Sequence, residues 1–242
     1  MLRLLACLAL VIAACAAHGQ AKPTRILFVG NSLTSVTDVP GRLVALARAM
    51  GREAQVESVT FNGYTLADHW SDGRALAAIR KGGWDYVVLQ SGSSGRRDSG
   101  AELVESVRQF AAPIRAVGAR PAIYMVWPLS DRQYEFPNTI EAYRSAAEAV
   151  DGLLLPVGEA WLRALSKDKR LRLYGDAIHP TSVGSDLIVL TMFFAFFPAG
   201  PQEFDEKFVE RLARQLDIPA RLRDPLVDAA TLAIDQPLKI SK

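Results

Sequence analysis

Short runs of β-branched and other apolar residues alternate along this chain with longer segments in which apolar residues recur every three to four positions. The short runs are candidate strands at 25–30, 54–60, 86–90, 122–126 and 153–157. Segments with helical spacing lie at 103–117 and near 40–51, 65–81, 138–150 and 183–197. Such alternation is typical of a parallel sheet covered by helices. We therefore predict an α/β fold with a five-stranded parallel sheet.

The chain after position 187 is also predicted to be helical. The run 187–197 is strongly apolar but too short to span a bilayer, which favours a helix buried against the sheet. The last segment, 199–242, shows the pattern of two amphipathic helices, with Pro219 and Pro225 as their expected boundaries. We expect this segment to pack on the same domain, whose core spans 24–198. Pro113 is expected to kink the helix at 103–117.

The first nineteen residues have the pattern of a secretory signal peptide. A positive start at Arg3 precedes the apolar stretch 4–17 and a group of small residues. This stretch is shorter than the ~18 residues that a membrane span needs. The sequence 12–15 (IAAC) also resembles the bacterial lipobox, which implies lipidation of Cys15. Both interpretations place the protein outside the cytoplasm, periplasmic or extracellular, and only the second anchors it to a membrane.

Composition narrows the function classes. Half of the 242 residues are hydrophobic and 22% are charged, which excludes a disordered chain or a coiled-coil array. The 28 basic and 26 acidic residues nearly balance, and no long basic stripe indicates a nucleic-acid partner. Both cysteines, Cys7 and Cys15, lie in the leader, so the body has neither disulfides nor a thiolate metal site.

A serine follows the first predicted strand, in the sequence Gly30-Asn31-Ser32. Ligands of open parallel sheets bind at the carboxyl ends of the strands, and a serine at such a turn presents its hydroxyl above the sheet. The same serine is equally compatible with capping a helix or binding a phosphate. Ser32 is a candidate nucleophile only if a base accompanies it.

His179 is the stronger candidate for that base. Asp176 precedes it by three residues on a predicted turn, where a carboxylate can reach the Nδ1 proton and leave Nε2 facing Ser32. Pro180 disfavours helical geometry at His179 and favours a loop. The other body histidine, His69, lies inside a predicted helix, where a packing or surface role is the default interpretation.

Together these residues resemble the SGNH (GDSL-type) hydrolase superfamily, whose members are serine hydrolases. The segment 30–34 (GNSLT) is similar to the first family block, with asparagine in place of aspartate, and 176–180 (DAIHP) is similar to the last. The resemblance implies a flavodoxin-like three-layer α/β/α sandwich and ester hydrolysis through an acyl-enzyme. It also implies an oxyanion hole that uses the N–H groups of Ser32 and Gly63, and neither a metal nor an organic cofactor.

The third family block departs from the pattern. Ser94 stands where the family has an asparagine that donates to the oxyanion, and Gln90, at the end of the same strand, is the alternative donor. Three further residues after strands are candidate walls of a substrate pocket: Asn31, Tyr64 and Trp127. The substrate classes left open are small acyl or lipid esters and O-acetyl groups on carbohydrate.

Two other functions compete with ester hydrolysis. The loop 91–97 (SGSSGRR) could cradle a phosphate on backbone N–H groups, as in a nucleotide-binding module. A degenerate SGNH fold retained for binding is the second alternative, motivated by the altered third block. A glycosidase is disfavoured because no pair of carboxylates after different strands can be singled out.

Overall fold

The computed structural model describes residues 22–92, 97–200 and 203–239, and its core is a parallel sheet of five strands. The sheet order is β2-β1-β3-β4-β5, and every neighbouring pair is parallel. The strands are β1 Thr24–Gly30, β2 Ala54–Thr60, β3 Tyr86–Leu89, β4 Arg120–Tyr124 and β5 Leu153–Leu155. The predicted α/β class and five-stranded parallel sheet are confirmed.

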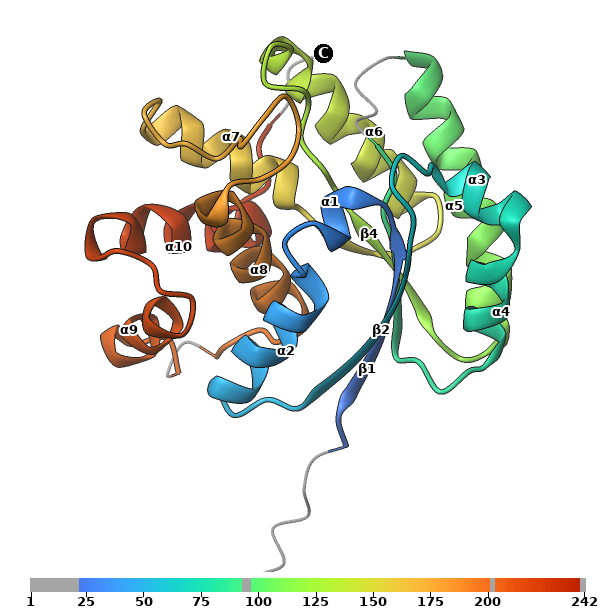
Figure 1. The fold of residues 1–242 in the computed structure, drawn as a ribbon, viewed down its shortest axis with the longest axis horizontal. Helices are drawn as coiled ribbons and strands as arrows, with labels where there is room; N and C mark the ends of the chain where they lie inside the picture. Colours follow the sequence, from blue (N-terminus) through green and yellow to red (C-terminus); the bar gives the residue numbers. More distant parts are fainter. Residues whose placement is uncertain (1–21, 93–96, 201–202, 240–242) are drawn as a thin grey trace, which may run out of the picture.

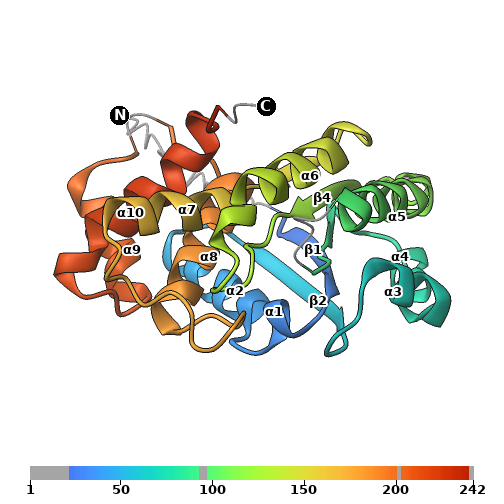
Figure 2. The same cartoon turned by 90° about the horizontal axis from the view of Figure 1, so that it is seen from above.

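Helices cover both faces of this sheet, which gives three layers (Figure 1 and Figure 2). On one side lie α2 Val39–Ala49 and α8 Ser182–Phe196, with α7 Val157–Lys167 beside α8. On the other side lie α3 Leu66–Asp72, α4 Arg74–Arg80, α5 Arg97–Ala116 and α6 Phe136–Glu148. The short helix α1 Ser32–Ser35 follows β1 at the top of the sheet.

The strand order explains where a site can form. From β1 the chain moves outward to β2, then returns to place β3 on the other side of β1, so the winding direction reverses between β1 and β3. Connections diverge at such a switch point and leave a crevice beyond the carboxyl ends of the strands. The residues that follow β1 and β3 therefore border the same crevice.

Some predicted elements differ from the observed ones. The predicted helix 65–81 is two helices, because Gly73 has a φ of 80° and ends α3 before α4 begins. The helix α7 was not predicted. Pro156 is its N-cap residue, and β5 ends just before this proline, two residues earlier than predicted. α5 runs through Pro113 without a break in the helix.

The C-terminal segment forms α9 Glu206–Gln215 and α10 Ala220–Asp235, and α10 packs against α7 and α8. Pro219 caps α10 as predicted, but Pro225 lies inside the helix, so the predicted boundary there is wrong. Proline leaves the carbonyl four residues earlier without its helical partner. That residue, Arg221, is exposed in the first turn, where water can bind the carbonyl.

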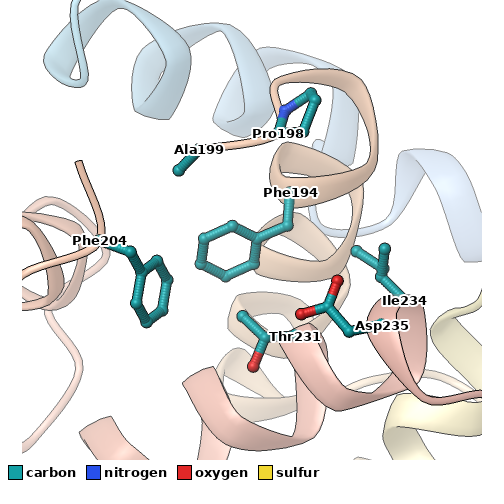
Figure 3. A pocket seen from close by; sticks show the side chains of 7 residues that line it. All are labelled: Phe194, Pro198, Ala199, Phe204, Thr231, Ile234 and Asp235. Atoms are coloured by element: carbon teal, nitrogen blue, oxygen red, sulfur yellow. The ribbon is translucent and has the colours of Figure 1, made fainter. Parts of the chain in front are cut away.

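A hollow of about 430 Å³ lies between the end of α8 and α10 (Figure 3). Phe194 and Phe204 both line it and contact each other with ring centroids 5.7 Å apart, and Asp235 is a further lining residue. Phe194 is near the end of α8 that lies farthest from His179, so this hollow is separate from the crevice above the sheet.

A buried carboxylate binds the segment near the end of the described chain. Glu159 on α7 is fully buried and accepts hydrogen bonds from Arg144 Nη2 on α6 (2.5 Å), from Arg163 and from the N–H of Leu238. Arg144 Nη1 also donates to the carbonyl of Leu238 (2.7 Å). A buried charge is tolerated only when it is paired and hydrogen-bonded, and the chain around Leu238 helps to meet that condition.

Candidate active site

The turn after β1 places Ser32 at the start of α1. Asn31 caps this helix, and its side-chain oxygen accepts the N–H of Leu33 (3.1 Å). Ser32 is the first helical residue, and its own N–H makes no hydrogen bond with the described residues. The N–H groups of a first turn lack helical partners, so this one is available to an anion or a polarised oxygen.

The loop before α8 brings Asp176 and His179 to that serine. The Asp176 Oδ1 accepts the N–H groups of Ile178 (2.8 Å) and His179 (2.7 Å). Its Oδ2 lies 2.8 Å from His179 Nδ1, and His179 Nε2 lies 2.9 Å from Ser32 Oγ. A carboxylate at Nδ1 holds the proton there, so Nε2 is free to accept the serine hydroxyl proton.

The Asp176 carboxylate is stabilised in its charged form. The backbone N–H groups of Ile178 and His179, followed by the His179 ring, lower the pKa of Asp176 to about 2. The carboxylate is therefore ionised at neutral pH. Because 58% of its side-chain surface is exposed, water also solvates the charge.

A tight turn after β2 lies beside the Ser32 turn. The N–H of Tyr64 donates to the carbonyl of Phe61 (3.1 Å), and Gly63 has a φ of +76°, which favours glycine. Asn31 Nδ2 donates to the Tyr64 carbonyl (2.9 Å) and joins the two turns. Gly63 is exposed, and its N–H makes no hydrogen bond with the described residues.

Gln90 does not point into the site. Its side chain is fully buried under the Ser32 turn, where Oε1 accepts the N–H of Asn31 (2.8 Å) and the hydroxyl of Thr34 (2.9 Å). Its Nε2 donates to Asn31 Oδ1 (2.9 Å) and to the Ser91 carbonyl. Both amide protons are used inside the protein, so the prediction of Gln90 as an oxyanion donor is wrong.

The same contacts explain why residue 30 is glycine. A Cβ at Gly30 would collide with the Gln90 amide oxygen and lie 2.8 Å from Thr34 Oγ1. Gly30 is therefore required by the close approach of Gln90. The other proposed donor, Ser94, lies outside the described residues.

Two predicted pocket walls do not line a pocket. Trp127 is fully buried, and its indole N–H donates to the Ile178 carbonyl (2.9 Å) below the His179 loop. Asn31 is only 7% exposed, and its side chain holds the two turns together. Tyr64 is half-buried beside the exposed Gly63, and its pocket role stays a prediction.

His69 is not placed to act as the base. It is fully buried, and its Nε2 donates to the carbonyl of Gly30 (2.8 Å). Its ring packs against Tyr64 and Phe61, with centroids 5.2 and 5.7 Å away. Its Nδ1 is buried without a partner among the described residues, so the neutral imidazole fits this environment and burial lowers its pKa.

Other predictions concern parts of the chain that the structure describes only partly. The loop 91–97 begins at Ser91 and Gly92, whose carbonyls accept the hydroxyl of Tyr143, but positions 93–96 lie outside the described residues. The leader 1–19, including Cys15, lies outside them as well. Within the described ranges, no group of acidic, histidine or cysteine side chains is arranged to hold a metal ion, and no helix could span a bilayer.

The sequence matches no family model and none of the curated proteins. Solved structures do resemble it. A protein from Slackia heliotrinireducens described as an SGNH hydrolase is 30% identical, with a TM-score of 0.60 over 72% of this chain and 100% of its own. A DUF4886 family protein from Bacteroides uniformis is 19% identical, with a TM-score of 0.68 over 91% of this chain and 98% of its own.

The acetyl-xylooligosaccharide esterase Axe2 from Geobacillus stearmophilus, solved as a mutant, is 16% identical and shares the fold at a TM-score of 0.53, over 72% of this chain and 92% of its own. The Slackia protein is matched along its whole length, and its 30% identity is sufficient to place both proteins in one family. A lipase/acylhydrolase from Enterococcus faecalis and a GDSL-like lipase from Parabacteroides merdae also share the fold. This chain belongs to the SGNH hydrolase superfamily of serine ester hydrolases.

Proposed function

We propose that the protein is an exported esterase that cleaves carboxylic esters through an acyl-enzyme on Ser32. The observation that carries this proposal is the pair of short contacts at His179. Its Nδ1 lies 2.8 Å from Asp176, and its Nε2 lies 2.9 Å from the Ser32 hydroxyl. Both distances suit proton transfer from the serine to the imidazole.

In the first half of the reaction, Ser32 Oγ attacks the ester carbonyl while His179 Nε2 takes the hydroxyl proton. Asp176 holds the imidazole in the required tautomer and stabilises the imidazolium. The tetrahedral oxyanion is bound by the N–H groups of Ser32 and Gly63, which have no other partner in the described chain. His179 then protonates the leaving alcohol, and the acyl group stays on Ser32.

In the second half, His179 removes a proton from water, which attacks the acyl carbonyl. The oxyanion forms again between the same two donors, and its collapse releases the carboxylic acid and returns the proton to Ser32 Oγ. One oxyanion donor contributes about 10²–10³ to turnover, so a third donor matters. With Gln90 committed elsewhere, Ser94 is the remaining side chain that we propose for that position.

The substrate that we propose is a short acyl ester, with O-acetyl groups on carbohydrate as the favoured class. Axe2, which shares this fold, is an acetyl-xylooligosaccharide esterase. The leader 1–19 supports export, and Cys15 is the proposed point of lipid attachment if the lipobox is used. Export would place the enzyme where polymeric esters are accessible.

A fluorophosphonate probe tests the nucleophile without knowledge of the substrate. We expect mass spectrometry of the labelled protein to find the phosphonyl group on Ser32, and hydrolysis of 4-nitrophenyl acetate to be lost in Ser32→Ala. Ser35→Ala is the matched control, because Ser35 is an exposed serine of the same short helix and should leave labelling and hydrolysis unchanged. Labelling elsewhere, or full activity in Ser32→Ala, would refute the mechanism.

A further inference from the structure

Three aromatic side chains from separate parts of the chain are packed together below the His179 loop. Trp127, which follows β4, and Trp161 on α7 are stacked with ring centroids 3.8 Å apart and planes within 5°. Tyr174, just before the loop, meets Trp161 edge-on at 5.2 Å. Both tryptophans are fully buried. Gly184 permits this packing, since a Cβ there would lie 2.7 Å from the Trp161 ring.

From this stack and the chain beside it, three hydrogen bonds reach the loop or its base. Trp127 Nε1 donates to the Ile178 carbonyl (2.9 Å), and the N–H of Ser130 donates to the Ala177 carbonyl (2.9 Å). The Tyr174 hydroxyl donates to the Pro128 carbonyl (2.9 Å) and holds the base of the loop to the same segment. The two residues immediately before His179 are therefore fixed from below.

The outer side of the loop has no comparable support. Asp176 and Ala177 are exposed, and a third of the His179 side-chain surface is accessible. The hydrogen bonds of Asp176 are all made to its own loop, and the His179 ring makes the contact with Ser32. Within the loop, the His179 carbonyl accepts the N–H of Gly175 (2.8 Å), and from below, the Trp127 N–H binds the carbonyl of the residue that precedes His179.

We infer that Trp127 is a positioning residue whose indole N–H, through the Ile178 carbonyl, holds the His179 imidazole within hydrogen-bond distance of Ser32. This inference rests on the proposed role of His179 as the base. A displacement of a catalytic group by about 1 Å can lower the rate about 10²-fold, even when the substitution that causes it lies at another residue. Trp127 is fully buried and so has no surface exposed to a substrate.

Trp161 provides a matched control inside the same stack. It is also fully buried and is the direct stacking partner of Trp127, but its indole N–H makes no hydrogen bond with the His179 loop. Replacing either tryptophan by phenylalanine removes an indole N–H and a similar volume. Loss of packing is therefore common to both variants, and loss of the bond to Ile178 is specific to Trp127→Phe.

The experiment compares Trp127→Phe, Trp161→Phe and Tyr174→Phe in the full mature chain, with 4-nitrophenyl acetate as substrate. We expect kcat of Trp127→Phe to fall by about 10-fold or more with little change in KM, because ground-state binding does not use this bond. Its rate of labelling by the fluorophosphonate should fall in parallel. We expect Trp161→Phe to keep kcat within about 2-fold, although its melting temperature falls, because a cavity costs stability and leaves the bond in place.

Proton NMR gives a readout that a purely structural role would not change. The proton shared by His179 Nδ1 and Asp176 should give a far-downfield signal, which we expect to be weakened or shifted in Trp127→Phe and kept in Trp161→Phe. Equal kcat losses in both tryptophan variants would assign the effect to packing and overturn the inference. Full kcat in a folded Trp127→Phe would also overturn it.

Tyr174→Phe keeps the test decisive if Trp127→Phe does not fold. It removes only the hydroxyl that binds the Pro128 carbonyl, so we expect a smaller fall in kcat, of about 3-fold to 10-fold, without a change in KM. An unchanged kcat would then overturn the inference. Failure of the proposed function is distinguishable, because it appears in the parent protein as absent labelling at Ser32.

Discussion

The turn that carries Ser32 and the loop that carries His179 meet across a 2.9 Å contact, but they are held by opposite means. The Ser32 turn lies on a buried polar network, in which His69 donates to the Gly30 carbonyl and Gln90 accepts the Asn31 N–H of the same peptide group. The His179 loop is exposed at its tip, is held by backbone hydrogen bonds to Asp176, and rests on buried aromatic rings.

Because of this difference, substitutions in the two regions should affect different properties, stability in one and activity in the other. A buried polar group that loses its partner costs folding free energy, because nothing else can satisfy it. An exposed side chain that loses its charge is still solvated. Removing the charge of Asp176 therefore lowers the catalytic rate but changes the free energy of unfolding little. We therefore expect substitutions in the His179 loop to affect activity alone, and substitutions below the Ser32 turn to affect stability as well.

The largest effect should come from Asp176→Asn. The asparagine oxygen can still accept the N–H groups of Ile178 and His179, but its NH₂ would face Nδ1 and move the imidazole proton to Nε2. We expect kcat to fall by about 10³–10⁴-fold, as it does when a triad histidine is held in the wrong tautomer. The melting temperature should change by about 2 °C or less.

Asp131→Asn is the control for this substitution. Asp131 is an exposed aspartate next to Ser130, and no side-chain contact of its carboxylate is seen in the described chain. Kinetics with 4-nitrophenyl acetate and thermal unfolding of both variants make the comparison. A large fall in melting temperature for Asp176→Asn would remove the distinction between the two regions.

The sequence was sufficient for the residues whose chemical type is distinctive. A serine after the first strand, and an Asp-x-x-His pattern before the last core helix, could be recognised because few other residues can act as nucleophile or base. The structure brings these residues together, and it also shows the predicted α/β fold. Continuous apolar runs identified β1, β3 and β4 because these strands are buried on both faces of the sheet over most of their length.

The supporting residues could not be predicted in the same way. Gln90 and Trp127 both follow strands, and their positions were compatible with pointing either into the crevice or below it. Which direction they take depends on partners that are distant in the sequence: Asn31 for Gln90, and Ile178 for Trp127. The one signal in the sequence was the glycine at position 30. The structure shows that its φ is not positive, so the close approach of Gln90 explains this glycine.

The next largest effect concerns Gln90, which supports the Ser32 turn. Gln90→Leu keeps a similar volume but leaves the buried Asn31 N–H and Thr34 hydroxyl without their acceptor, and it removes one donor from Asn31 Oδ1 and one from the Ser91 carbonyl. We expect the free energy of unfolding to fall by about 3 kcal/mol, because each unsatisfied buried group costs about 1–3 kcal/mol. Denaturant unfolding measures this change, and kcat should fall with it.

Gln109→Leu is the matched control, because Gln109 is exposed on α5. Its effect on the free energy of unfolding should stay within about 0.5 kcal/mol. If Gln90→Leu lost activity but kept its stability, Gln90 would act at the site itself, and the buried network would not explain how the Ser32 turn is held.

The smallest expected effect is a pH dependence of stability from His69. Burial lowers the pKa of this imidazole below its ordinary value of 6.5, against the opposing effects of its bond to Gly30 and of the nearby Asp72 and Asp68. The unfolded chain then binds a proton that the folded chain resists. Stability from this group is complete above about pH 6.5 and is lost as the pH falls below it, by at most about 1.4 kcal/mol per pH unit.

His69→Gln isolates this contribution, since a glutamine amide can donate to the Gly30 carbonyl but does not titrate. We expect the unfolding free energies of the parent and of His69→Gln, measured between pH 7.5 and about pH 5, to converge as the pH falls. Two parallel curves would mean that the buried imidazole takes up a proton as easily as an exposed one. In that case the network below Ser32 would tolerate a charge, and the contrast with the exposed Asp176 would rest on Gln90 alone.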